Sequence, residues 1–359
     1  MKYWRGYLIA AILLACNWAL REFARAHSLL VDMVYPYVTR MVQSYLVDWS
    51  GGVSFCLWQV LLMAALVIGL AAVVLMVIFK WNPIQWLGWA CAIVMLVVFA
   101  NTCVYGLNEF SGPLAEDVRM EATDYNTAEL EQAAIYYRDQ ANKLSGQLKR
   151  DEKGNVIFAD FEALAKQASD GFETLVYEES MSVFAGSMKP VKPLGWAEQF
   201  TGWGIAGVTV GLTGEAAVNP QAPAVMLPFV MCQQMAKRMS IVVPQDASFA
   251  AYLACRSNAY TQFQYSGMLM SYRYCLQTLI RLDGVTGDGA AARVMAGQTA
   301  GVTQDLQLCD DFFGDNEPAD SNACDLLVSW HIEEIVLPAQ LIEQEKFNPL
   351  DKNQVGALD

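Results

Sequence analysis

The stretch Val53–Phe79, VSFCLWQVLLMAALVIGLAAVVLMVIF, decides the architecture of this chain. It contains no charged residue, and a helix that crosses a bilayer needs about 20 apolar residues in sequence. The segment 84–107 has the same character and is reached through the loop KWNPIQW, whose tryptophans suit a membrane interface. Both segments predict transmembrane helices, because buried helices of soluble domains seldom run so far without a charge.

The N-terminal segment is a third membrane candidate. Gly6–Leu20 follows two basic residues and is itself uncharged, which predicts a helix over about 6–22 that enters the membrane and is tilted or continued through Tyr45. A cleaved signal peptide has a similar pattern. A lipid anchor at Cys16 is a weaker alternative, since Leu14 fits a lipoprotein cleavage box poorly and no polar linker follows.

Basic residues in the short loops predict the orientation of the chain, because lysine and arginine favour the cytoplasmic side. Lys2, Arg5 and Lys80 place the N-terminus and the second loop in the cytoplasm, whereas three arginines of the first loop argue the other way. With three spans, this predicts a multi-pass membrane protein in which everything after residue 108 is extracytoplasmic. The lipid bilayer is then one partner of the chain.

Composition excludes several classes of protein. The net charge of −14 and the pI near 4.6 exclude a nucleic-acid binder held by bulk electrostatics. The chain has two histidines, His27 and His331, so it contains no H-x-x-x-H metal motif, and we expect no metal and no cofactor. The near absence of ionisable residues in the spans disfavours a transport subunit, which remains an alternative.

The remainder of the chain divides into two regions. Polar segments with helical apolar stripes predict a helical hairpin region over 109–195. The glycine-rich stretch Thr201–Asn219 has a β-branched centre and predicts a strand within a mostly helical domain over 196–359. Cys309 and Cys324 bracket an acidic loop, and in an extracytoplasmic domain a disulfide between them would contribute about 3 kcal/mol.

The segment 225–249, VMLPFVMCQQMAKRMSIVVPQDASF, resembles a motif of the bacterial membrane family called domain of unknown function 3810. The family pattern is proline-phenylalanine, a cysteine, H-E-x-A-H-R and, downstream, E-A-N-F. Matching residues here are Pro228, Phe229, Cys232, Ala236, Arg238, Ala247 and Phe249. Further similar pieces are 105–108, 113–114, 213–219, 251–255 and 265–267, so the resemblance covers roughly residues 20–285.

The resemblance implies a zincin-like fold, in which two histidines one helical turn apart bind zinc and the glutamate is the general base. This chain departs from the pattern at all three positions, which are Gln233, Gln234 and Lys237. Asp246 falls on the downstream acid. A glutamine cannot take a proton from water, and a lysine would place a cation where the metal should lie. These positions therefore predict a degenerate site, in which an ion pair between Lys237 and Asp246 replaces the metal. In the alternative, Lys237 extends into solvent and Asp246 caps the next helix.

The predicted fold class is mainly α, with N-terminal transmembrane helices followed by a mostly helical zincin-like domain that has a small strand region. The predicted function is a membrane-anchored, non-catalytic zincin-like protein, a pseudopeptidase that binds a peptide or partner protein along an edge strand at Ile205–Leu212. The expected binding residues are Thr209, Val210, Glu215 and Tyr265. The alternative enzyme is a metallohydrolase whose ligands are Asp246 and Glu215.

Overall fold

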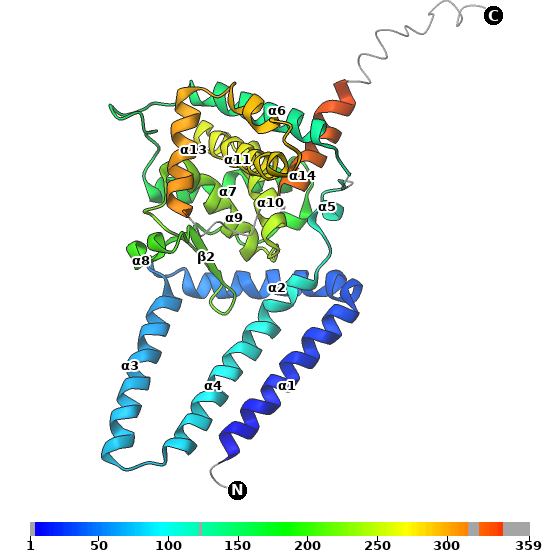
Figure 1. Cartoon of the computed structure of the whole chain (residues 1–359). Coiled ribbons are helices and arrows are strands. Elements are labelled where there is room, and N and C mark those ends of the chain that lie inside the picture. The colour runs from blue at the N-terminus through cyan, green and yellow to red at the C-terminus, as the bar shows by residue number, and fades with distance from the viewer. Residues whose placement is uncertain (1–3, 121, 123, 315–322, 340–359) are drawn as a thin grey trace, which may run out of the picture.

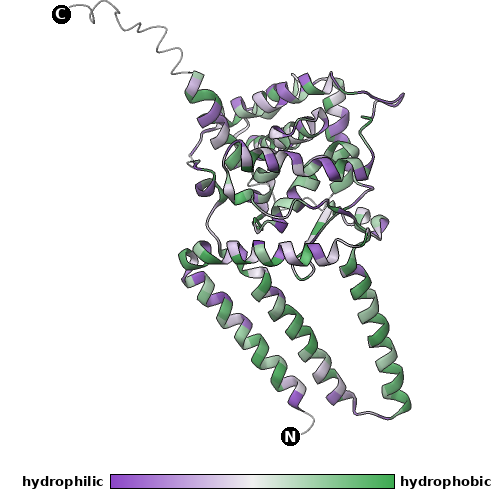
Figure 2. Ribbon diagram, turned by 180° about the vertical axis from the view of Figure 1, so that it is seen from behind, coloured by the Kyte–Doolittle hydropathy of each residue, from purple (hydrophilic) through white to green (hydrophobic). Residues whose placement is uncertain are grey.

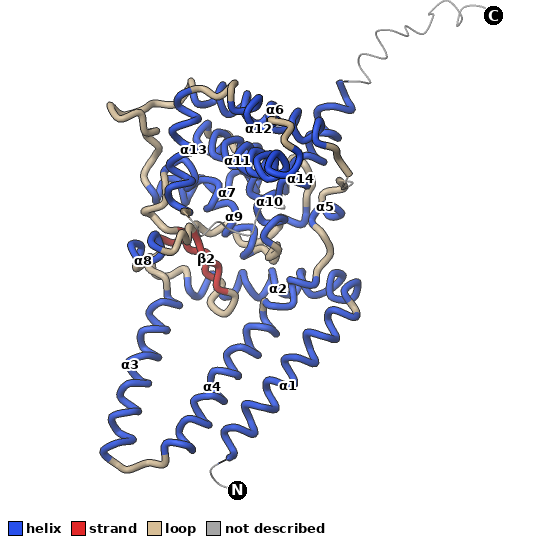
Figure 3. Tube along the Cα trace, in the orientation of Figure 1, coloured by secondary structure: helices blue, strands red, loops and turns tan. Residues whose placement is uncertain are grey.

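The computed structural model describes residues 4–120, 122, 124–314 and 323–339. The chain is mainly helical, and its few strands lie together near the membrane helices (Figure 3). A helical domain sits on one end of a group of long apolar helices, and the N-terminus lies at the other end (Figure 1). The acidic loop predicted between Cys309 and Cys324 falls largely on 315–322, outside the described residues.

Among the described residues, three helices are long and apolar enough to cross a membrane, as the sequence predicted. They are α1 (Arg5–Ala26), α3 (Leu57–Ile78) and α4 (Pro83–Val104). Helices α1 and α4 pack together so closely that a Cβ added to Gly6 would lie 2.4 Å from the backbone of Gly88. Glycine is required there because no side chain fits between the two backbones.

Helix α2 (Ser28–Ser50) is not a continuation of the first span, as the sequence had suggested for the segment through Tyr45. It lies across the ends of α1, α3 and α4, between them and the domain (Figures 1 and 2). One face is buried against the domain, and the other exposes large apolar side chains at four-residue intervals. These are Leu29, Met33, Tyr37, Met41, Tyr45 and Trp49. Such a two-faced helix is typical of one that lies in the plane of a membrane interface.

The domain contains ten further α-helices among the described residues. They are α5 (Leu114–Asp117), α6 (Thr127–Ser145), α7 (Phe161–Tyr177), α8 (Ala197–Gly202), α9 (Leu227–Arg238), α10 (Pro244–Ser257), α11 (Thr261–Thr286), α12 (Ala290–Met295), α13 (Ala300–Phe313) and α14 (Ala323–His331). Short helical turns, η2 (Gly106–Phe110), η3 (Ser182–Phe184), η4 (Ala224–Met226) and the π-turn η6 (Ile332–Val336), connect or extend them.

Local sequence explains where several of these helices begin. The Asn126 side chain accepts from the Ala128 and Glu129 amides, and Glu129 accepts in return from the Asn126 amide, which makes a capping box. Pro228 and Pro244 stand in the first turns of α9 and α10, where the missing amide hydrogen costs nothing. Helix α9 ends at Arg238, before the proline that opens α10.

The predicted hairpin of 109–195 does not form as a separate region. Helix α6 packs chiefly against α11, whereas α7 packs against α9 and α10. Both contribute to one apolar core that also takes in α9, α10, α11 and α14. The boundary expected at residue 195 therefore cuts through a single packed unit. The two helices separate because each presents its apolar stripe to a different partner across that core.

The sheet has three short strands in the order β1-β3-β2. Strand β1 (Lys192–Pro193) runs parallel to β3 (Glu215–Val218), and β2 (Gly207–Val210) runs antiparallel to it, with Thr209 opposite Ala216. Strand β2 lies at an edge of the sheet and within the stretch Ile205–Leu212, as the sequence predicted. Helix α9 packs against both β2 and β3.

A buried ion pair fastens this sheet to the membrane helices. The Glu215 carboxylate accepts hydrogen bonds from the amides of Leu57 (2.7 Å) and Trp58 (2.8 Å), which are the first two residues of α3. Lys192 Nζ lies 2.7 Å from Glu215 Oε1 and also donates to the carbonyl of Ser50, the last residue of α2. The Glu215 side chain is completely buried. A carboxylate at a helix N-terminus satisfies orphan amides and complements the helix dipole.

We expect Glu215→Ala to destabilise the protein by about 3–5 kcal/mol, because it leaves Lys192 as an unpaired cation in a largely buried site. The double variant Glu215→Gln/Lys192→Met should recover most of that loss, since the glutamine can still accept an α3 amide and no charge remains. Thermal unfolding of the full chain in detergent measures both. Equal losses in the single and double variants would contradict a role for the ion pair.

Candidate functional site

The α9 segment that the sequence singled out as a motif lines a groove between α9, α11, α13 and the entry to β2. The cavity has a volume of about 250 Å³, and Gln233, Gln234 and Lys237 of α9 lie along it. Its other walls are mostly apolar, from Trp203, Ile205, Ala206, Met226, Phe229, Val230, Met270, Tyr274 and Phe313. Three of the four residues that the sequence singled out are therefore brought together beside the edge strand.

The amides of the groove are joined in a chain of hydrogen bonds. Thr209 Oγ1 donates to Gln234 Oε1 (3.0 Å), and Gln234 Nε2 donates to Gln233 Oε1 (3.2 Å). Gln233 Nε2 in turn donates to Ser248 Oγ of α10 (2.8 Å). Both glutamines are buried, so these contacts satisfy polar groups that would otherwise be costly. Of the predicted binding residues, Thr209 is the one tied directly to the motif.

Gly207 allows β2 to lie close over the motif helix. A Cβ at this position would meet the Gln234 side chain at 2.7 Å. The strand also leaves part of its backbone without a partner in β3. The Ala206 carbonyl accepts from the Asn219 amide (2.7 Å) and the Val210 carbonyl from the Thr213 amide of the turn, so alternate residues face β3. Gly207 and Thr209 then direct their N–H and C=O groups away from the sheet.

Asp246 is not part of this groove. It lines a separate cavity of about 290 Å³ between α2, η2 and α10, together with Asp32, Arg40 and Asp117. Its Oδ2 accepts from the Leu114 amide (3.3 Å), and its Oδ1 has no hydrogen-bond partner among the described residues. The predicted ion pair between Lys237 and Asp246 is therefore wrong. The α10 residue that faces the motif is Ser248, two positions farther along the helix.

Burial gives Asp246 an unusual titration. The residue is 4% exposed, and the loss of solvation raises its pKa from 3.8 to about 6. The Leu114 amide opposes this shift and the nearby Asp117 adds to it. Burial likewise raises the pKa of Asp117 and lowers that of Arg40 in the same cavity.

The other three predicted binding residues have structural contacts. Glu215 is the residue that caps α3, and Val210 pairs with it in the sheet. Tyr265 lies in α11, and its hydroxyl donates to Asp305, which also holds Arg150 in a two-pronged ion pair with bonds of 3.0 and 2.6 Å. Neither Glu215 nor Tyr265 lines the groove.

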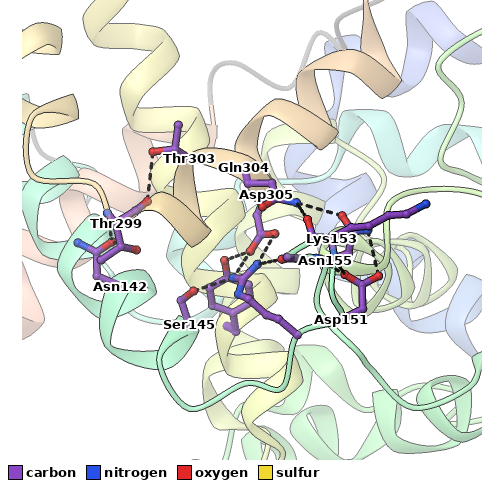
Figure 4. Close-up of polar contacts among 12 residues, drawn as sticks. Asn142, Ser145, Asp151, Lys153, Asn155, Thr299, Thr303, Gln304 and Asp305 are labelled. Carbon is purple, nitrogen blue, oxygen red and sulfur yellow. Dashed lines mark hydrogen bonds and ion pairs between the residues drawn. The ribbon is translucent and has the colours of Figure 1, made fainter.

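Asp305 and its polar neighbours lie where the loop after α6 meets α13 (Figure 4). Ser145 accepts from Arg150, and Gln304 donates to the Lys153 carbonyl and to Asn155. Burial raises the pKa of the Tyr265 hydroxyl, and the bond to Asp305 raises the pKa of Arg150. The cluster is a satisfied polar network that holds the 145–155 segment on the core.

The cysteines do not pair as expected. All nine are free thiols, and Cys309 and Cys324 are both buried. Cys324 of α14 lies beside Cys275 of α11, and Cys232 lies beside Cys255. Burial raises the pKa of Cys275 and Cys255, which keeps these thiols protonated. Side-chain packing across helices, which sequence spacing does not reveal, decides these neighbours.

Comparison with known proteins agrees with the resemblance seen in the sequence. The profile of one family, described as "Protein of unknown function (DUF3810)", matches residues 31–325. No curated protein and no solved structure matches the chain. Within the described residues there is no group of three or more His, Cys, Asp or Glu side chains placed to hold a metal ion.

We expect Asp246→Asn to stabilise the protein at pH 7.5 by about 1–3 kcal/mol and to give no gain at pH 4. The folded protein binds this proton more tightly than the unfolded chain does, whose aspartate pKa is about 3.9. The wild-type protein therefore loses stability as pH rises from about 4 through about 6. The asparagine side chain of the variant does not ionise, so the variant does not lose this stability. Thermal unfolding of both proteins across this pH range tests whether the advantage of the variant grows as pH rises.

The matched control is Asp151→Asn. Asp151 is an exposed aspartate whose pKa is lowered by the Asn155 amide, so neutralising it should give no gain at either pH. If Asp246→Asn behaves like this control, the carboxyl group of Asp246 does not carry the burial penalty inferred here.

Proposed function

Since the chain belongs to the DUF3810 family, whose function is not described, we propose that it is a membrane-anchored, non-catalytic protein that binds an extended peptide or a segment of a partner protein. The observation that carries the proposal is the edge of β2 beside the groove of Gln233, Gln234 and Lys237. The scaffold would be zincin-like, with its metal site lost. The bacterial cell membrane is the location that the family resemblance implies.

The edge of β2 that faces away from β3 is the first feature that supports peptide binding. An extended peptide can add to an exposed strand edge through main-chain hydrogen bonds, and pockets for alternate side chains then provide selectivity. The outward backbone groups of Gly207 and Thr209 offer such bonds. The groove lies alongside, so a side chain of the added strand would enter it.

The hydrogen-bonded side chains of Gln233 and Gln234 are the second feature, and they support binding without catalysis. Water activation at a zincin site needs a metal and a carboxylate base. Here the corresponding positions carry neutral glutamines that are bonded to each other, to Thr209 and to Ser248. A neutral amide neither accepts a proton from water nor generates hydroxide. This arrangement supports binding without hydrolysis.

The groove lining indicates the kind of peptide that would fit. Its walls are mostly aromatic and aliphatic, which favours an apolar side chain. Lys237 adds a cation at one side, so a nearby acidic residue in the peptide would gain a charge-assisted contact. We therefore propose a linear segment that combines an apolar anchor with an acidic neighbour.

The alternative metallohydrolase, with Asp246 and Glu215 as ligands, is not favoured by the geometry. Asp246 and Glu215 line different cavities. The Glu215 carboxylate is already bonded to two amides of α3 and to Lys192. Using it as a ligand would break the attachment of the sheet to the membrane helices.

The proposed topology places the domain outside the cytoplasm. Arg5 and Lys80 lie at the ends of the apolar helices that point away from the domain (Figure 1). Basic residues in short loops favour the cytoplasmic side. The basic residues at the other end include Arg21, which is paired with Glu109 (2.7 Å).

Binding can be tested with a library of random linear peptides displayed on phage and panned against the full chain in nanodiscs. We expect selected peptides to bind about tenfold more weakly to Thr209→Pro, which removes an outward N–H from the strand edge. Thr209→Ala keeps that N–H and should bind normally. Fluorescence anisotropy of labelled peptides measures the difference, with thermal unfolding as the check that both variants fold.

A second variant tests the charge in the groove. Lys237→Gln should weaken peptides that contain an acidic residue and leave purely apolar peptides unchanged. Selected peptides that bind all three variants equally well would contradict binding at the edge of β2. A library from which no peptide is enriched would contradict it as well.

For topology, we expect an alkaline phosphatase fused after Asp359 to be active and a green fluorescent protein at the same place to be dark, because the former matures outside the cytoplasm and the latter inside. Fusions within the loop after α3, at Asn82, should give the opposite pattern. A fluorescent C-terminal fusion with an inactive phosphatase would reverse the proposed orientation.

A further inference from the structure

A second cavity, of about 440 Å³, lies where the domain meets the membrane helices and is distinct from the β2 groove. One wall is the end of α2 and the loop that leads into α3, represented by Ser50 and Ser54. The opposite wall is the start of α7 and the end of α9, and the segment 189–193 closes one side. Because α3 begins at Leu57, the cavity lies at the membrane boundary.

The cavity is rich in positive charge. Three lysines and one arginine line it, against two glutamates. Lys192 is neutralised by Glu215, and Lys189 makes a contact of 3.5 Å with Asp48 in which both side chains are well exposed. Exposed contacts of that kind contribute little. Lys166 is exposed at the start of α7.

Arg238 is the decisive residue, because it is a buried cation with no carboxylate partner among the described residues. It is 2% exposed, and its guanidinium donates to the carbonyls of Ser187 (2.9 Å) and Lys189. Its Nε has no hydrogen-bond partner in the part of the chain that the structure describes. Burial lowers its pKa to about 10, and no anion of the described residues opposes that shift. A buried charge is costly unless it is paired, so Arg238 lacks a counter-ion.

The walls and surroundings indicate where that counter-ion comes from. Val47, Val53 and Phe161 give the cavity apolar surface beside its charges. Trp49 and Phe55, which flank the loop, are 66% and 51% exposed, as expected of aromatic side chains at a membrane interface. An arginine fork matches the oxygens of a phosphate group better than a lysine does.

We propose that this cavity binds the phosphate of an anionic ligand, held by Arg238 with Lys166 and Lys189 at its entrance, and that the ligand is the headgroup of a membrane phospholipid. The headgroup would enter from the side of the α2–α3 loop, with its acyl chains remaining beside α3. It would provide the anion that Arg238 lacks and would stabilise the contact between domain and membrane.

The test uses the full chain in nanodiscs made of phosphatidylcholine alone or with added phosphatidylglycerol. Native mass spectrometry counts the phosphatidylglycerol molecules that remain bound after release from the disc. We expect one tightly retained lipid on the wild-type protein. Retention should fall about tenfold in Lys166→Gln/Lys189→Gln and should be lost in Arg238→Gln.

The matched control is Lys143→Gln/Lys149→Gln, which makes the same charge change on exposed residues at the end of α6 and just beyond it, away from the cavity. It should retain the lipid as the wild type does. Equal losses in the two double variants would mean that lipid is held by overall charge and would overturn the proposal. Because Arg238→Gln can fail to fold, the double variants decide the result if its thermal transition is lost.

A separate arm distinguishes lipid from soluble phosphate. Inorganic phosphate is added to the protein in discs of phosphatidylcholine alone, and thermal unfolding is followed. No shift with phosphate, together with a rise in the midpoint when phosphatidylglycerol is present, supports the lipid. A rise with inorganic phosphate that Lys166→Gln/Lys189→Gln abolishes, without specific lipid retention, would overturn the lipid as the source.

Discussion

The buried pair of Glu215 and Lys192 is the interaction on which the arrangement of this protein depends. Its carboxylate caps the first amides of α3, and its ammonium holds the end of α2, so one ion pair joins the sheet to two helices of the membrane region. A helix that begins with no side-chain cap of its own has unsatisfied amides. The domain supplies their partner, and neither part is complete without the other.

That attachment positions both candidate binding sites. The β2–β3 turn rests on α2, where Gln43 donates to the Gly211 carbonyl (2.8 Å), and on Tyr105 at the end of α4. Strand β2 is thereby held with its free edge beside the α9 groove. The cavity that contains Arg238 is lined by Gly214 of the same turn and by the α2–α3 loop. A partner that bound either site would contact the domain close to the bilayer.

Helix α2 explains how the domain can be held in this way. Its polar and small side chains, among them Thr39, Arg40 and Gln43, face the domain and are buried. Its large apolar side chains are exposed on the opposite face. The helix itself lies between the domain and the apolar helices (Figure 2). The four-residue spacing from Leu29 to Trp49 is visible in the sequence, but it does not identify an interfacial helix, because hydropathy alone does not distinguish a span from an interfacial helix.

The sequence by itself determined the three apolar helices, the strand within Ile205–Leu212 and the helix opened by Pro228, because these depend on local composition, periodicity and proline geometry. It also determined that Gln233 and Lys237, one helical turn apart, share one helix face. Tertiary structure alone decided which partners they meet. The turn from α9 into α10 directs Ser248 to the motif and Asp246 into another cavity, so an ion pair inferred from spacing did not form. The same holds for Glu215, whose role as the cap of α3 depends on a contact between residues far apart in the chain, and no local pattern encodes such a contact.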